Sequence, residues 1–211
     1  MRGCRPLTVR EQDQALAVLQ GARLDKRNRC LVLMGLNTGF RISELLSLRI
    51  GQVLHRGYVL ERVRVERANI KGKREGRDVA LNREARQALA EWIPVLIGWR
   101  GAGDDVFLFQ SNKGGRITRR QASRIMSGLA ARLGWPPRIG THSLRKTFAG
   151  DVYEWAMRNW TPSQENPIRV VMRALGHSSV AVTEAYLGLD MAQVDKAVMS
   201  LGRRRGNHAS V

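Results

Sequence analysis

The chain has 211 residues, enough for one sizeable domain or two small ones, and 43% of them are hydrophobic, as in an ordinary globular core. Its 36 Lys and Arg residues outnumber 18 Asp and Glu residues, so the formal net charge is +18 and the pI is near 11.4. This imbalance argues against an ordinary cytosolic enzyme of small molecules and favours a polyanionic partner, first of all nucleic acid.

Membrane, secreted and metal-binding classes are disfavoured by the sequence. The longest apolar runs, residues 30–36 and 92–99, are far shorter than the roughly 20 residues that cross a bilayer, and the N-terminus turns polar at once. The two cysteines, Cys4 and Cys30, are too few for a disulfide framework and lack metal-ligand spacing. We therefore expect a reduced, cytoplasmic protein with no membrane contact, in which Cys30 packs inside an apolar helix.

Two helices are predicted at the start of the chain. Thr8 and Glu11 have the spacing of a capping box in front of an apolar periodic segment, which indicates a helix start. A second segment from Asp25 is apolar almost all round and stops at Gly39, a residue suited to the left-handed position after a helix. This second helix should be buried and should deliver the residues after Gly39 to a fixed place.

Short alternating runs between residues 50 and 81 predict two or three antiparallel strands. They are separated by "IKGKREG", residues 70–76, which we interpret as a basic hairpin at the tip of the strands. Helical periodicity returns at residues 82–99, followed by a strand-like "DVFLF" at residues 105–109 and a polar loop.

The rest of the chain reads as helices joined by polar breaks. We expect helices at residues 118–135, capped by Thr118, and at 141–160, 168–177, 179–188 and 191–201. Only the tail, residues 202–211, should be disordered. The predicted fold class is mixed α/β, mainly helical, with one small antiparallel sheet.

Four polar signatures lie at predicted element ends or tight turns, where side chains can converge on a ligand. In chain order they supply an arginine, a lysine, a His-x-x-Arg pair, a histidine and a tyrosine, which is the set that tyrosine-based phosphodiester cleavage needs. The signatures are "TGFRISEL" with Arg41, "NIKGKREG" with Lys71 and Lys73, "THSLRK" with His142 and Arg145, and "LGHSSVAVTEAY" with His177 and Tyr186.

The arginines of this set would activate the tyrosine and hold the phosphate. A tyrosine hydroxyl has an unperturbed pKa of about 10, so Tyr186 would attack phosphorus poorly unless a base takes its proton or positive charge favours the phenolate. Arg41 and Arg145 would supply that charge and bind two phosphate oxygens through their planar forks. Removing one such donor typically costs about 2.7–4 kcal/mol of transition-state stabilisation.

The remaining groups would move protons. Lys71 is our preferred general acid for the departing 5′ oxygen, with Lys73 as the alternative on the same hairpin. His142 can exchange a proton with the tyrosine or contact the phosphate, and His177 can donate to a phosphate oxygen. The sequence contains no tight carboxylate cluster that would hold Mg²⁺, so we expect no metal ion in the site.

These signatures resemble those of the tyrosine recombinase (phage integrase) family. "TGFRISEL" looks like the first arginine box, including the supporting acidic residue, here Glu44, and "HSLRK" and "LGHSSVAVTEAY" look like the later boxes. The resemblance runs from about Leu7 to about Leu189. It implies a mainly helical catalytic domain whose small antiparallel sheet carries the lysine hairpin. The implied reaction cleaves a DNA strand through a 3′-phosphotyrosyl link and rejoins it to a partner strand without ATP or metal.

The resemblance also implies the domain layout and the partners. Residues 1–189 would form the catalytic domain, and residues 190–201 a C-terminal helix whose apolar stripe packs either on a neighbouring protomer or on its own domain. Residues 202–211 would be a disordered basic tail. The expected partner is double-stranded DNA, and the expected assembly is a homo-oligomer on DNA, a tetrameric synapse of two paired sites.

The sequence departs from the family pattern at three places. Lys146 occupies the last position of the second box, where a second histidine is frequent, and residues 153–167 resemble an insertion. The catalytic domain starts almost at Met1, without the N-terminal clamp domain of most members, which suggests a single-domain member, a fragment or a remnant. Two rival functions therefore stay open: relaxation of supercoiled DNA by a type IB topoisomerase-like enzyme, and a non-catalytic DNA-binding protein that modulates a full-length recombinase.

Overall fold

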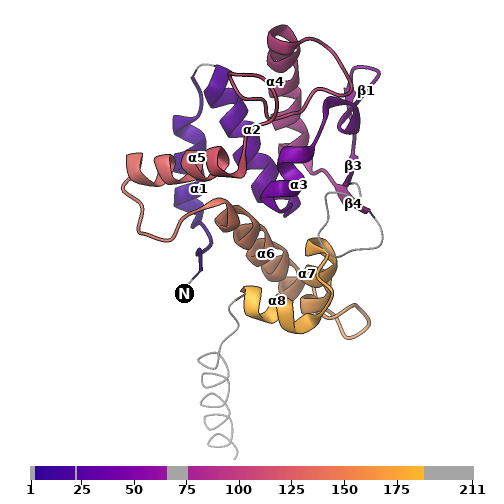
Figure 1. The fold of residues 1–211 in the computed structure, drawn as a ribbon. Helices are drawn as coiled ribbons and strands as arrows, with labels where there is room; N and C mark the ends of the chain where they lie inside the picture. The colour runs from indigo at the N-terminus through magenta and orange to yellow at the C-terminus, as the bar shows by residue number, and fades with distance from the viewer. Residues whose placement is uncertain (1–2, 22, 66–75, 188–211) are drawn as a thin grey trace, which may run out of the picture.

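A computed structural model describes residues 3–21, 23–65 and 76–187, which are called the described residues below. Within them the chain forms eight α-helices, one short 3-10 helix and four short strands (Figure 1). The elements in order are α1 (Val9–Val18), α2 (Arg23–Thr38), α3 (Ile42–Ser47), η1 (Ile50–Gln52), β1 (Leu54–His55), β2 (Tyr58–Val59), β3 (Arg62–Val65), β4 (Arg77–Ala80), α4 (Arg83–Arg100), α5 (Arg119–Arg132), α6 (Thr141–Arg158), α7 (Pro167–Leu175) and α8 (Val180–Leu187).

The predicted starts of the N-terminal helices are confirmed. Thr8 caps α1 by accepting from the Glu11 N–H at 3.2 Å, while the Glu11 carboxylate accepts from the Thr8 N–H at 2.8 Å, which completes the capping box. In α2, Cys30 and its apolar neighbours are buried, and burial raises the pKa of the Cys30 thiol. This thiol is therefore protonated and inert at neutral pH.

The end of α2 is fixed by a glycine against α6. Gly39 has a φ of +59°, the left-handed conformation predicted for it. A Cβ at this position would collide with the ring of Phe148 on α6. Helix α2 packs along both α4 and α6 (Figure 1). The turn after Gly39 places Arg41 beside His142 and Arg145 of α6.

The strands form two separate two-stranded antiparallel pairs where one small sheet was predicted. In one, β1 and β2 are joined by a tight turn at Arg56 and Gly57, both with positive φ, as this kind of hairpin requires. In the other, β3 pairs with β4, and Val63 lies opposite Val79. The predicted strand at residues 105–109 is reduced to one isolated bridge, between Arg49 and Phe107. Its two hydrogen bonds run from the Ile50 N–H to the Val106 carbonyl and from the Leu108 N–H to the Leu48 carbonyl.

Helix α6 connects the main core to a smaller C-terminal layer. Its first half packs on α2 and α5, and α7 and α8 pack on α6 farther along, where Ala149, Val171 and Leu175 form a small buried cluster (Figure 1). No helix among the described ranges is both long enough and apolar enough to cross a membrane. The expected C-terminal helix 190–201 and tail 202–211 lie outside the described residues.

Candidate active site

Arg41 is held at the start of α3, a helix that the sequence analysis did not predict. Its backbone N–H donates to Glu44 Oε2 at 2.9 Å, and its guanidinium donates to Glu44 Oε1 at 2.8 Å. The Glu44 side chain is 1% exposed, whereas 34% of the Arg41 side chain is exposed. Glu44 therefore fixes one edge of the guanidinium and leaves part of it open to a ligand.

Arg145 joins three separate parts of the chain from its place on α6. It is buried, and it donates to the carbonyl of Gly39 and, at 2.9 Å, to the carbonyl of Leu175. A second contact of the same nitrogen is His177 Nε2, at 3.2 Å. Burial, together with the charge of Arg41, lowers the pKa of Arg145 to about 10, so this guanidinium stays charged at neutral pH.

His177 directly follows the left-handed Gly176 that ends α7. Its Nδ1 lies 3.1 Å from the hydroxyl of Thr183, a fully buried residue of α8 whose hydroxyl lies 3.3 Å from the Ser179 carbonyl. An arginine can only donate, so Nε2 accepts from Arg145, and the ring proton is assigned to Nδ1, which donates to Thr183. Thr183 then donates its own proton to Ser179, and the imidazole is fixed as one neutral tautomer.

Tyr186 lies on α8 beside this histidine. The two rings meet edge to face, with centroids 5.4 Å apart, and the charged ends of Arg145 and Lys146 lie 5.9 and 5.6 Å from the tyrosine ring centroid. The hydroxyl is buried and makes no hydrogen bond of good geometry with any described residue. Burial raises the pKa of Tyr186, against the opposing charges of Arg145 and Arg41, so the resting phenol is protonated.

His142 lies in the first turn of α6, one turn before Arg145. A shallow surface depression, called the hollow below, lies here and is lined by Phe40, Arg41, Ile42, Thr141, His142 and Arg145. His142 lies at the surface, with part of its ring covered by the protein. This partial desolvation, together with the charges of Arg145, Arg41 and Lys146, lowers the pKa of His142 and favours a neutral ring at pH 7. The free N–H groups at a helix N-terminus attract anions, and this hollow combines such an end with two arginines.

The structure thus brings together five of the predicted residues: Arg41, His142, Arg145, His177 and Tyr186. The sixth, Lys71, and its alternative Lys73 lie outside the described residues. Within the ranges that are described, no group of three or more His, Cys, Asp or Glu side chains is placed to hold a metal ion. A larger apolar groove of about 860 Å³ lies between the β1–β2 turn and α4, and none of the predicted residues lines it.

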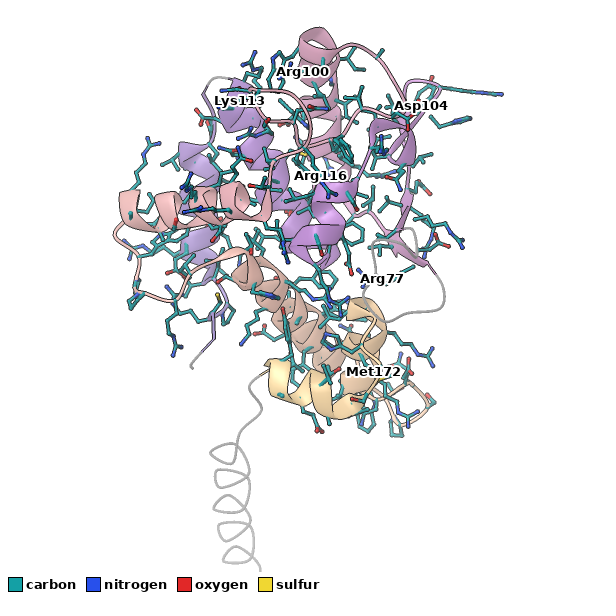
Figure 2. The ribbon with its side chains drawn as sticks, viewed as in Figure 1. Arg77, Arg100, Asp104, Lys113, Arg116 and Met172 are labelled. Carbon is teal, nitrogen blue, oxygen red and sulfur yellow. The ribbon has the colours of Figure 1, made fainter. Side chains whose placement is uncertain are left out.

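Arg77 is a further residue of this site that was not predicted from the sequence, where it was only part of a predicted strand. Arg77 begins β4, and it lies where this strand faces α7 (Figure 2). Its side chain is 13% exposed; one nitrogen donates to the Ala174 carbonyl at 2.6 Å, and the other lies 3.5 Å from Glu44 Oε2. A sequence signal existed, because the two-residue period of a strand puts Arg77 on the same face as the buried Val79.

Comparison with known proteins decides which family these residues represent. The family model described as "Phage integrase family" matches residues 5–193, most of the chain. The chain belongs to the phage integrase family. This result confirms the resemblance drawn from the four signatures, and the mainly helical fold class is confirmed by solved structures of the family.

Among its relatives is the tyrosine recombinase XerC of Thermodesulfovibrio yellowstonii (strain ATCC 51303 / DSM 11347 / YP87), 29% identical over 188 residues, which are 85% of this chain and 57% of that protein. The structure resembles that of XerA recombinase, with a TM-score of 0.68 and 24% identity, over 95% of this chain and 64% of that one. It also resembles XerH site-specific recombinase bound to a palindromic difH substrate in a post-cleavage complex, with a TM-score of 0.67 and 25% identity, over 92% of this chain and 51% of that one. The chain spans a little over half of the length of the curated relatives it matches.

Proposed function

We propose that this protein is a site-specific DNA recombinase that cleaves and rejoins DNA strands through a covalent link to Tyr186. The observation that carries the proposal is the arrangement around Arg145, which contacts His177 and lies beside the Tyr186 ring while Arg41 lies across the same hollow. Two charged guanidiniums next to a buried tyrosine hydroxyl suit a phosphodiester whose negative charge increases during attack.

The scissile phosphate would bind over the hollow between Arg41 and Arg145, near the N-terminus of α6. Tyr186 Oη then attacks phosphorus, a new oxygen–phosphorus bond forms, and the bond from phosphorus to the 5′ oxygen breaks. The departing 5′ oxygen takes a proton from Lys71 and leaves as a hydroxyl. A 5′-hydroxyl of the partner strand reverses these steps and releases Tyr186, so the energy of the phosphodiester is kept in the covalent link.

The tyrosine proton needs an acceptor, since burial raises the pKa of Tyr186 and keeps the phenol protonated. His142 suits this task because its lowered pKa favours the neutral ring at pH 7. The tautomer of His177 leaves only Nε2 as an acceptor, and Arg145 already donates to it. We therefore assign proton removal to His142. The contact of His177 with the phosphate that the sequence predicts would require a proton on Nε2 in the DNA-bound state, in place of the bond from Arg145.

The partner we propose is double-stranded DNA, with four protomers acting on two paired sites. The net charge of +18 favours a polyanion, and the similar XerH structure is a complex with its DNA substrate. We also propose a cytoplasmic location, because the enzyme has to reach its DNA. The assignment as a recombinase rests on the family and on the site, and no feature of the described residues favours topoisomerase activity.

A nicked duplex that traps the covalent intermediate tests the proposal directly. The duplex carries the DNA that flanks the gene, and the readout is a protein–DNA adduct that survives denaturant. We expect the adduct with the parent protein and none with Tyr186→Phe. Tyr153→Phe is the matched control, because Tyr153 is a partly buried tyrosine of α6 that packs on the same small cluster.

Three other outcomes would contradict parts of the proposal. Equal trapping by Tyr186→Phe would exclude Tyr186 as the nucleophile. Specific binding of this DNA without any adduct would favour the non-catalytic, DNA-binding function. Relaxation of supercoiled DNA by a monomer without sequence preference would favour the topoisomerase-like function.

A further inference from the structure

The C-terminal end of α7 positions His177. Side chains from other elements bond to the last carbonyls of this helix. The last four carbonyls of any helix lack partners within that helix. In α7 the first two of these, on Met172 and Arg173, accept from the backbone N–H groups of Gly176 and His177. No backbone N–H of the described residues is bonded to the remaining two carbonyls, on Ala174 and Leu175.

Two arginines from different elements fill these last places. Arg145 of α6 donates to the Leu175 carbonyl at 2.9 Å, and Arg77 of β4 donates to the Ala174 carbonyl at 2.6 Å. Positive charge at a helix C-terminus is favourable because of the helix dipole. The turn that carries His177 is therefore held by one arginine with a proposed catalytic role and by a second arginine with none assigned.

The same Arg77 side chain also reaches the buried partner of Arg41. Its second terminal nitrogen lies 3.5 Å from Glu44 Oε2, while Arg41 occupies Oε1. A carboxylate that is 1% exposed needs compensating charge, and Arg77 supplies a second cation next to it. The Arg77 guanidinium also lies 5.4 Å from the centroid of the Phe40 ring, which limits its movement.

We propose that Arg77 is a positioning residue that fixes Arg41, through Glu44, and His177, through the end of α7, relative to one another. The inference rests on the proposed function. Arg77 commits both terminal nitrogens to the protein, so it acts on the phosphate through these two groups and not by contact.

Arginine is required here by its shape. Two acceptors on different elements are reached by two nitrogens of one planar group, and a lysine ammonium is a single point charge that can serve only one of them well. Displacing a catalytic group by about 1 Å can cost roughly 100-fold in rate. We therefore expect Arg77→Met to slow covalent adduct formation roughly 10- to 100-fold, and Arg77→Lys to recover part of the loss.

The test measures single-turnover adduct formation at saturating nicked duplex, the dissociation constant for the same duplex, and the thermal unfolding midpoint. We expect Arg77→Met to lower the rate at saturation and to leave DNA affinity unchanged. Arg86→Met is the matched control, since Arg86 is also an ion-paired arginine, bonded to Glu61 at 3.1 Å on the exposed side of α4. This control should keep the parent rate.

A substrate with sulfur in place of the 5′ bridging oxygen adds a chemical readout. A thiolate leaves without protonation, so this substrate corrects a defect in the general acid and not a defect in phosphate binding. The Arg77→Met defect should persist with sulfur. If the sulfur substrate restored the rate of Arg77→Met, the assignment to Arg41 and His177 would be wrong. The positioning role would be wrong if the adduct rate of Arg77→Met equalled that of the parent. It would also be wrong if the loss of rate were matched by losses of DNA affinity and thermal stability. Failure of the parent protein to form any adduct would instead refute the proposed function.

Discussion

The Arg145 guanidinium lies 3.2 Å from His177 Nε2 and also donates to the carbonyls of Gly39 and Leu175. One buried side chain thus joins the end of α2, the end of α7 and the turn before α8. Arg41 follows the end of α2, His177 lies in the turn between α7 and α8, and Tyr186 lies on α8. The relative position of the proposed phosphate-binding groups therefore depends on a residue that would also bind the phosphate itself.

Arg145→Lys should impair both folding and cleavage. A lysine cannot satisfy the carbonyls of Gly39 and Leu175 together, and each buried acceptor left without a donor costs about 1–3 kcal/mol. We expect a lower urea midpoint and a covalent-adduct rate reduced roughly 100- to 1,000-fold, the usual effect of removing a transition-state donor. A variant with the parent's midpoint and rate would show that this arginine neither joins these elements nor binds the phosphate.

Thr183→Val should affect cleavage more than folding. Valine has nearly the same shape as threonine but cannot accept from Nδ1 of His177, so the ring loses one of the two contacts that orient it. A neutral hydrogen bond contributes about 1 kcal/mol, which corresponds to roughly 5-fold in rate. Thr183→Ser keeps the hydroxyl and should retain the parent rate of adduct formation. Equal rates for the valine and serine variants would argue against this role.

Tyr186→Phe should leave the protein at least as stable as the parent. The hydroxyl is buried and has no hydrogen-bond partner of good geometry among the described residues, so its removal relieves a desolvation cost of about 1–3 kcal/mol. Urea unfolding without DNA measures the difference in the free energy of unfolding. A clear loss of stability would mean that the hydroxyl has a structural partner in the folded protein.

Glu11→Gln should change how stability depends on pH. Hydrogen bonds from Arg5 are the main reason that the pKa of Glu11 falls from its ordinary 4.5 to about 2. A depressed carboxylate pKa means that the unfolded chain binds the proton first, so this stabilisation is complete above pH 4.5 and is lost as pH falls towards 2. The parent's advantage over Glu11→Gln in urea midpoint should therefore be larger at about pH 7 than at about pH 3. An equal advantage at both pH values would contradict this ion pair's role.

Local signals in the sequence predicted most of the fold. The Thr8–Glu11 capping box, the apolar run that became α2 and the left-handed Gly39 depend on interactions within a few residues, and all three are confirmed. The prediction of one small antiparallel sheet was less accurate, because the strands form two separate pairs. Whether neighbouring short strands pair in one sheet depends on the direction the chain takes after β2, where it bends at Glu61. The alternation of apolar and polar residues predicts strands but not this direction.

The residues of the candidate site also fall into those predicted from the sequence and those found only in the structure. The order and spacing of the four signatures identified the family and pointed to Arg41, His142, Arg145, His177 and Tyr186. Sequence alone was sufficient for this because each reactive group must be one particular residue type. The catalytic roles, including those of Lys71 and Lys73, remain predictions.

Only the tertiary structure revealed which side chains position the proposed reactive residues. The contacts from Arg77 to Glu44 and Ala174, and from Thr183 to His177, connect elements by side chains buried between them. A buried hydrogen bond depends on which surfaces pack together, and packing is decided by the whole core. The sequence by itself thus determined the chemistry of the reactive groups, and the fold decided their partners and geometry.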